Sequence, residues 1–353
     1  ANTEAVFRHV LDQLEKALDQ YKLERALELR DAAVQVERLC DGPDLAKRLR
    51  RLLARCAAAE SDVKGALHHM QLHVRDLITQ AEIVSDQSCE AFLRLALSLY
   101  AHGRNAAALR LCNAAVELAA EDRESWASFH SLQYLRGYIM ATLGQLYAGL
   151  SLMEQYRNHT DGKDLNGQRW RIGLVMQMAG LLTFGEAFNY GEDGEIKAQF
   201  LLVFATWRGD ADSMRRALDY YESSVVEPRP PLLFAHLARA LLDAPDKPDA
   251  LEKFEADCRR DFPGDGEDPD YVSARARIAI ALGDKALARK LVRSLDQRLS
   301  DPAERCDMPV LAMGRHYRNV VELGMKGDIR ERASDFFTRH VDLGYRCFAK
   351  LGD

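Results

Sequence analysis

The segment AFLRLALSLYAHGRNAAALRLCNAAVELAAED, residues 91–122, sets the architecture that we expect for the whole chain. Apolar residues recur in it at three- and four-residue spacing, which is the period of a helix with one buried face. A glycine divides the segment, so it predicts two antiparallel helices joined by a tight turn. Small residues where the two helices cross let their backbones approach closely. The residues of this frame are Phe92, Leu95, Ala96, Leu99, Gly103, Ala108, Cys112 and Ala115.

Glycine followed by aspartate marks further turns of this kind. Glycine takes the left-handed backbone conformation that ends one helix, and the aspartate side chain then caps the exposed amides of the next helix. Aligning the chain on these turns predicts about seven helix pairs. The dipeptides are Gly209-Asp210, Gly283-Asp284 and Gly327-Asp328.

The crossing position of the first helix differs between the predicted pairs. Leu53 and Leu202 place a large residue there and depart from the frame. Four pairs keep a small residue there. Leucine in place of Gly137, or of Ala108 on the second helix, is expected to overpack the crossing at a cost of about 1–3 kcal/mol. The small residues of the four first helices are Ala96, Gly137, Ala238 and Ala276.

Alternating strand patterns of useful length are missing, so the sequence predicts an all-α chain. We expect an α-solenoid of antiparallel helix pairs, because stacked pairs bury a continuous core. Residues 1–160 are predicted to form N-terminal repeats, and residues 196–353 C-terminal repeats with a capping helix. Between them, residues 161–195 are predicted to form a hinge, with an extra helix at 167–184 followed by a loop at 185–195.

Composition excludes several classes of protein. The 353 residues are 47% hydrophobic and 29% charged, which suits amphipathic helices around a core. The net charge of −6 gives no overall attraction to nucleic acid or to anionic membranes, and no apolar run is long enough to span a bilayer. The seven cysteines form no CxxC pair, which argues against a disulfide framework or a zinc ribbon and favours a cytoplasmic location.

The recurring frame resembles the tetratricopeptide-repeat family over most of the chain. The signature Trp, Tyr and Pro of that family are largely absent, and the Ala- and Arg-rich helices look more like the arrays of bacterial regulators. The resemblance implies a right-handed superhelix whose first helices line a concave groove for a peptide or a partner helix. It implies no catalytic residues, and it fits the sensory or docking part of a regulator.

In this register, side chains of the first helices that point away from the second helices share one face, where arginines alternate with aromatic residues. Guanidinium groups bind carboxylates through paired hydrogen bonds, and aromatic rings supply contact area at low entropic cost. The sequence therefore predicts a groove for an acidic peptide or partner protein. The predicted groove residues are Arg50, Arg51, Arg94, Tyr100, Tyr134, Tyr138, Phe200, Trp207, His236, Arg239, Arg277, Tyr317 and Arg318.

The same pattern is compatible with other interpretations. These side chains could pair with neighbouring carboxylates or pack into the core. The chain could also be a small-molecule-responsive receptor, with a pocket near the mid-chain interruption between Trp170 and Trp207, or an enzyme whose active site is not local in sequence. An aromatic-rich C-terminal helix could cap the last repeat or form a homodimer. Its residues are Ala333, Phe336, Phe337, Val341, Leu343, Tyr345 and Phe348.

No catalytic, metal or cofactor signature stands out. His69 and His73 lie one helical turn apart, but Met70 occupies the position of the catalytic glutamate in a zinc protease motif. The acidic stretch 261–270 lacks the spacing of a calcium loop. No P-loop, dinucleotide fingerprint or nucleophile elbow occurs, so we expect a non-enzyme without a cofactor. Two cysteines at core positions of the frame are expected to be buried apolar residues, Cys56 and Cys112.

Overall fold

A helix pair forms across residues 91–122, as the frame predicts. In the computed structural model, α5 (Asp86–Ala101) packs against α6 (Asn105–Leu118). Gly103 joins the two helices with a left-handed φ of +71°. Most of the predicted core positions are buried, as the frame predicts, while Leu99 is half-buried. The buried residues are Phe92, Leu95, Ala96, Ala108, Cys112 and Ala115.

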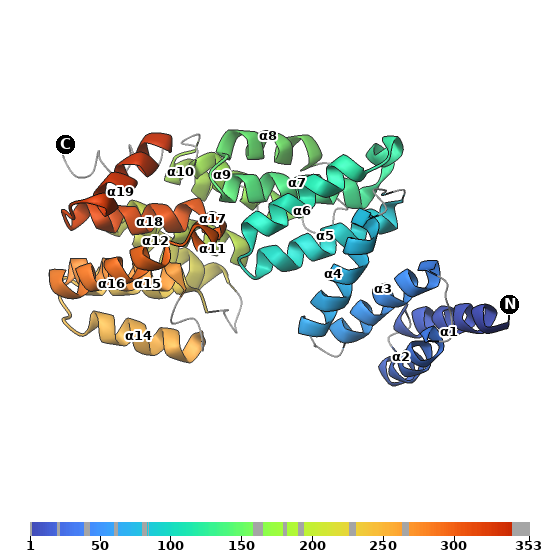
Figure 1. Ribbon diagram of the computed structural model, residues 1–353. Helices are drawn as coiled ribbons and strands as arrows, with labels where there is room; N and C mark the ends of the chain where they lie inside the picture. The colour runs from blue at the N-terminus through green and yellow to red at the C-terminus, as the bar shows by residue number, and fades with distance from the viewer. Residues whose placement is uncertain are drawn as a thin grey trace. The chain divides into compact units, whose positions relative to one another are not determined.

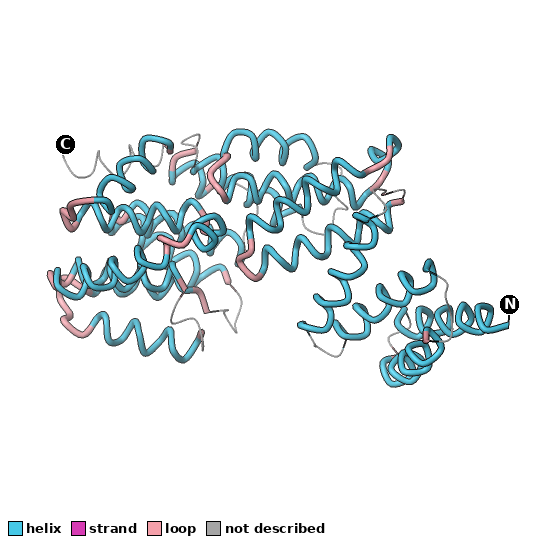
Figure 2. Tube along the Cα trace, viewed as in Figure 1, coloured by secondary structure: helices cyan, strands magenta, loops and turns pink. Residues whose placement is uncertain are grey.

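Helices account for nearly all of the secondary structure (Figure 2). Among the described residues no strand forms, and one isolated bridge joins Ile83 to Ala119. The all-α prediction is therefore confirmed for that part of the chain. The structure describes residues 2–19, 22–38, 43–59, 63–79, 83, 85–157, 165–178, 182–189, 194–225, 231–262 and 268–340.

The chain divides into two compact units, residues 1–135 and residues 136–353. In the first unit α1 packs on α2, α3 on α4 and α5 on α6, so each helix pairs with its neighbour in sequence (Figure 1). Apolar side chains of α1, α2 and α3 form a buried core that includes Phe7, Leu11 and Leu52. The remaining elements of this unit are α1 (Asn2–Asp19), α2 (Leu23–Glu37), α3 (Pro43–Ala59), α4 (Val63–Thr79), the 3-10 helix η1 (Glu121–Ser125) and the start of α7 (Ala127–Thr142).

The second unit repeats the pairing. Helix α11 packs on α12, α13 on α14, α15 on α16 and α18 on α19, while α11, α13, α15 and α18 contact one another in series. Serial contact between helix pairs is compatible with a repeat array. The solenoid arrangement and its right-handed superhelix stay predictions. The helices after α7 are α8 (Leu146–Tyr156), α9 (Leu165–Met178), α10 (Phe184–Phe188), α11 (Glu195–Arg208), α12 (Ala211–Ser224), α13 (Leu233–Asp243), α14 (Ala250–Asp261), α15 (Pro269–Ala281), α16 (Lys285–Arg298), α17 (Pro302–Asp307), α18 (Val310–Glu322) and α19 (Asp328–Arg339).

Small residues make the crossing of α7 and α8 possible. A Cβ atom on Gly137 would lie 2.8 Å from the carbonyl oxygen of Gly149, and one on Gly149 would lie 2.7 Å from the amide nitrogen of Ala141. Both distances are shorter than real Cβ contacts, and both involve backbone atoms that cannot swing away. The two glycines therefore allow the helices to touch backbone to backbone, as predicted for Gly137.

Two of the three Gly-Asp turns have the predicted geometry. Gly283 has a φ of +80°, and the carboxylate of Asp284 accepts a hydrogen bond from the amide of Leu287 at 3.0 Å. The pair at 209–210 has the same arrangement. The third prediction is wrong, because Gly327 is itself the residue that precedes α19 and Asp328 is the first residue of the helix, where its side chain makes no cap.

The middle of the chain differs in part from its prediction. Helix α9 covers the first part of the extra helix expected at 167–184, but it ends at Met178, and Phe184 begins α10. The loop expected at 185–195 contains α10, so its first part is helical, and residues 190–193 lie outside the described residues. The boundary between the compact units falls inside α7, whereas the sequence predicts a hinge at 161–195.

Candidate functional site

Arginines on α3, predicted to line the groove, form ion pairs within the first unit. Arg50 pairs with Asp76 of α4. A guanidinium nitrogen of Arg51 lies 2.6 Å from Glu15 of α1, and the same carboxylate lies 2.5 Å from Arg48. All these side chains are partly buried, so the pairs connect α3 to its two neighbours.

Arg94 and the two tyrosines of the first unit lie in different surroundings. Arg94 is exposed on α5 and pairs with Glu90 one turn earlier, at 2.6 Å. Tyr100 is half-buried near the end of the same helix. Tyr134 is buried in α7. Of these predicted groove residues, only Arg94 stands on an open surface, and its charge is already matched by its neighbour.

Arginines of the second unit are paired as well. Arg239 of α13 lies 2.9 Å from Glu222 of α12, and its guanidinium stacks 5.9 Å from the ring centre of Tyr221. Arg277 of α15 pairs with Glu322 of α18. These contacts connect one helix pair to the next, so the arginines have a structural role.

The aromatic groove residues of α11 and α18 belong to the core. Phe200, Trp207 and Tyr317 are buried within the large apolar cluster of the second unit. Arg318 is buried beside them and donates a hydrogen bond to the main-chain carbonyl of Trp207. These rings therefore do not form the open face of a groove for a partner chain. The pocket expected between Trp170 and Trp207 cannot be followed at Trp170, whose side chain lies outside the described residues.

Tyr138 and His236 complete the predicted set. The guanidinium of Arg171 lies 5.6 Å from the ring centre of half-buried Tyr138. His236 is buried, and its Nε2 atom lies 2.9 Å from a carboxylate oxygen of Asp261. Burial lowers the pKa of His236, and the hydrogen bond to Asp261 opposes that shift. Hydrogen bonds from Arg260 lower the pKa of Asp261, so this group supplies a fixed negative charge.

The histidine and acidic candidates also have structural roles. His73 is buried in α4, and no cluster of three metal-binding side chains occurs among the described residues. In the acidic stretch 261–270, Asp268 caps α15 by accepting hydrogen bonds from two backbone amides, and Asp270 lies 2.7 Å from Arg315. Residues 263–267 lie outside the described residues.

Most cysteines and the aromatic residues of α19 are buried in the described ranges, whereas Cys306 is exposed. Cys56 and Cys112 are fully buried, as predicted. Burial raises the pKa of the Cys89 thiol to about 11, which keeps it protonated and unreactive at neutral pH. Phe336 and Phe337 pack into the core of the second unit, and residues 341–353 of the proposed dimer seam lie outside the described residues.

A basic surface that the sequence analysis missed runs along α16. Lys285, Arg289, Lys290 and Arg293 are exposed on this helix, whereas its one acidic residue, Asp296, is partly buried and pairs with Arg332 of α19. None of the four cations has a carboxylate within ion-pair distance in the described part of the chain. The spacing of the four residues was visible in the sequence as a helical stripe of one charge.

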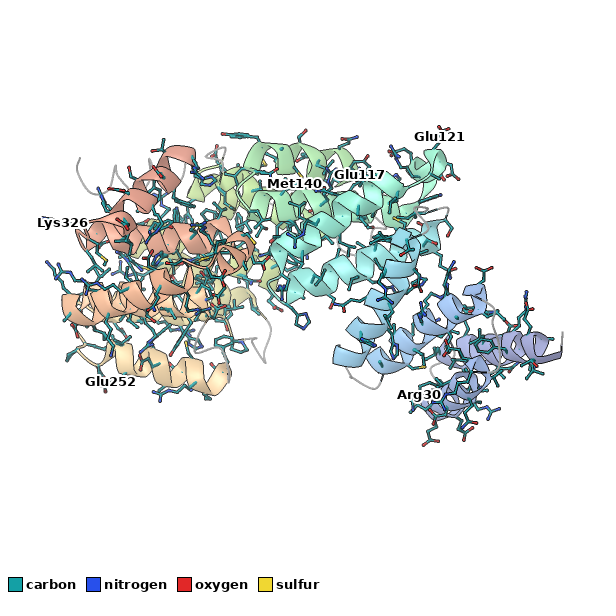
Figure 3. All side chains as sticks on the ribbon, in the orientation of Figure 1. Arg30, Glu117, Glu121, Met140, Glu252 and Lys326 are labelled. Carbon is teal, nitrogen blue, oxygen red and sulfur yellow. The ribbon has the colours of Figure 1, made fainter. Side chains whose placement is uncertain are left out.

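The basic surface extends beyond α16 itself. Arg289, Lys290 and Arg293 share an open face of α16 with Ala286, Ser294 and Gln297. Arg289 donates a hydrogen bond of 3.4 Å to the carbonyl of Leu323, where α18 ends. The exposed Lys326 follows in the same turn (Figure 3).

Comparisons with known proteins give no further guide to the site. A scan against protein-family models finds no match for the chain, and a search of curated proteins finds none either. No helix in the described ranges is long and apolar enough to cross a lipid bilayer.

Proposed function

We propose that this chain is a non-catalytic interaction module, built on a tetratricopeptide-like solenoid, that binds an acidic segment of a partner protein. The observation that carries the proposal is the basic surface of α16, defined as Lys285, Arg289, Lys290 and Arg293. The interaction class agrees with the sequence analysis. The location differs, because the predicted groove lay on the first helices and α16 is the second helix of its pair.

The predicted groove is a weaker candidate for binding a carboxylate. Its arginines Arg50, Arg51, Arg94, Arg239 and Arg277 each have a carboxylate of this chain as a partner. An incoming acidic side chain would have to displace that partner, so the exchange of one ion pair for another yields little net free energy.

The basic surface of α16 is energetically unfavourable for the chain alone. Lys285 and Arg289, and Arg289 and Arg293, are like charges four residues apart on one helix. Each such pair destabilises a helix by about 0.2–0.5 kcal/mol, and Lys285 also lies at the positive end of the helix dipole. Acidic side chains of a partner would relieve this repulsion, since no carboxylate of the described chain does so. The excess positive charge is local, because the whole chain carries −6.

The test measures binding of a labelled acidic peptide to the full chain by fluorescence anisotropy. The probe is a fluorescein-labelled peptide that alternates Glu and Leu, and a peptide that alternates Gln and Leu is its neutral counterpart. A triple variant, Arg289→Glu, Lys290→Glu, Arg293→Glu, is expected to weaken binding about tenfold, because three exposed charge pairs of about 0.5 kcal/mol each are lost. Added salt should weaken binding to the unchanged chain, since exposed charges are screened.

A matched control separates this surface from net charge. The variant Lys16→Glu, Arg110→Glu, Arg215→Glu makes the same charge change at exposed residues on three other helices. It should bind the acidic peptide with unchanged affinity. Equal loss in both variants, tight binding of the neutral peptide, or preference for a duplex DNA probe would each contradict the proposal.

A further inference from the structure

A pocket of about 620 Å³ is lined mainly by residues of α17, α18 and α19, at the C-terminal end of the described chain. Figure 1 shows where these three helices lie. The volume lies within the range of about 300–1,000 Å³ that is usual for small-molecule pockets. All of its lining residues belong to the second compact unit. The pocket is separate from the basic surface of α16, because the two share no lining residue.

The floor of the pocket is apolar and aromatic. Met308, Val310, Tyr317 and Phe336 line it, and all are buried in the core of the unit. The rings of Tyr317 and Phe336 lie 5.3 Å apart in a tilted arrangement. Buried side chains are held in place by their packing, so the floor is a preformed surface that suits an apolar or aromatic body.

The rim of the pocket is cationic. It carries Arg305, Arg332 and Arg339, against a single carboxylate, Asp335. A guanidinium nitrogen of Arg332 lies 2.6 Å from the largely buried carboxylate of Asp296, which fixes the direction of the side chain. Within the described residues, neither Arg305 nor Arg339 has an ion-pair partner. The rim therefore has a net positive charge above an apolar floor.

We propose that this pocket binds a small organic carboxylate with an aromatic or aliphatic body. The body would lie on the apolar floor, and the carboxylate would receive charge-assisted hydrogen bonds from the arginines at the rim. Guanidinium groups suit this role, because their planar set of donors matches the two oxygens of a carboxylate. The proposal adds a small-molecule site to the interaction module and places it away from the mid-chain position expected from the sequence.

Cys306 gives a readout that is specific to this pocket. Its thiol lines the pocket and is exposed on α17, whereas Cys56, Cys89 and Cys112 are buried. A bound ligand should slow the alkylation of Cys306 by iodoacetamide, measured residue by residue with mass spectrometry. This readout localises binding, while a thermal shift reports only that binding occurs.

The experiment compares acids with matched alcohols on the full chain. Three acids are tested, phenylbutyrate, octanoate and indoleacetate, each beside the alcohol with the same carbon skeleton. Inorganic phosphate is the control for an anion that has no apolar group. At least one acid is expected to raise the melting temperature and protect Cys306, with an affinity about tenfold above that of its alcohol. Inorganic phosphate should do neither.

Variants test the rim directly. The double variant Arg305→Gln, Arg339→Gln changes exposed side chains and should weaken binding of the acid about tenfold. Arg215→Gln on α12 is the control for an exposed arginine elsewhere, and it should leave binding unchanged, as should the triple variant of α16. Equal effects of acid and alcohol, unchanged affinity in the double variant, or an absence of Cys306 protection by every acid would overturn the proposal.

Discussion

At the scale of single residues, His73 shows how burial changes the chemistry of a side chain. It lies in α4 with 8% of its surface exposed, and burial lowers its pKa from 6.5 to about 4. Arg51, Lys47 and Arg50 lower the pKa further by repelling a second positive charge. In the unfolded chain the same side chain titrates near its ordinary value, so the two states bind protons differently between about pH 6.5 and pH 4.

This difference predicts the direction of a pH effect on stability. Above about pH 6.5 His73 is neutral in both states, and it contributes no pH dependence. Below that value His73 binds a proton in the unfolded chain but stays neutral in the folded chain. The free energy of unfolding therefore falls by about 1.4 kcal/mol per pH unit until about pH 4. Urea unfolding at a series of pH values should therefore show a shallower loss for His73→Leu than for the unchanged chain. Parallel profiles would contradict the assignment.

The difference between the two profiles isolates His73 from the other buried histidines. Burial also lowers the pKa values of His236 and His316, which lie in the second unit and are unchanged in the variant. Their contributions cancel when the profiles are subtracted, because distant sites contribute independently.

At the scale of helices, the close crossing of α7 and α8 should decide how a glycine-to-alanine substitution changes stability. The steric cost at the crossing should exceed the gain from the higher helix propensity of alanine. Gly149→Ala adds a Cβ atom that would lie 2.7 Å from the amide nitrogen of Ala141. We expect this variant to lose about 1–3 kcal/mol of stability in urea unfolding, because the two helices must separate. Gly185→Ala in α10 is the matched control, since its Cβ atom would meet nothing within 4 Å. Alanine should be neutral or stabilising there, and equal losses at the two positions would refute the close crossing.

The helix pairs could be predicted from the sequence, but most ion pairs of the groove arginines could not. The crossing of two helices that are adjacent in sequence depends on residues that are close in the chain. The pattern at residues 91–122 was therefore sufficient to predict the crossing of α5 and α6. The partner of Arg94 is one turn away and was visible in the sequence. By contrast, the pairs Arg51–Glu15 and Arg277–Glu322 join residues far apart in the chain, and only the packing of whole helices brings them together.

The prediction that aromatic residues line an open groove was wrong because helical spacing gives only part of the information. Helical spacing shows that Phe200, Trp207 and Tyr317 share a face with the predicted groove arginines, but it does not show whether another helix covers that face. In the second unit the serial contacts of α11, α13, α15 and α18 cover it. The pocket at α17–α19 was also hidden, because its lining comes from helices whose packing no local pattern encodes.

At the scale of the whole molecule, the two compact units contain separate cores. The cluster of Phe7, Leu11 and Leu52 lies entirely within residues 1–135, and the cluster around Phe204 lies within residues 136–353. Both proposed binding surfaces belong to the second unit. Damage to the first core should therefore leave these surfaces in place if each unit is cooperative by itself.

Hydrogen exchange can test this independence. Leu52→Ala removes a fully buried side chain from α3 and should cost about 2–5 kcal/mol. We expect amide protection to fall across the helices of the first unit, while α11–α19 keep their protection and α16 keeps its affinity for the acidic peptide. Leu97→Ala on α5 is the control, because Leu97 is 46% exposed and its loss creates no cavity. Equal loss of protection in both units would contradict this prediction. It would mean that the two units unfold together, because a local cavity lowers the stability of distant helices only when the units are strongly coupled.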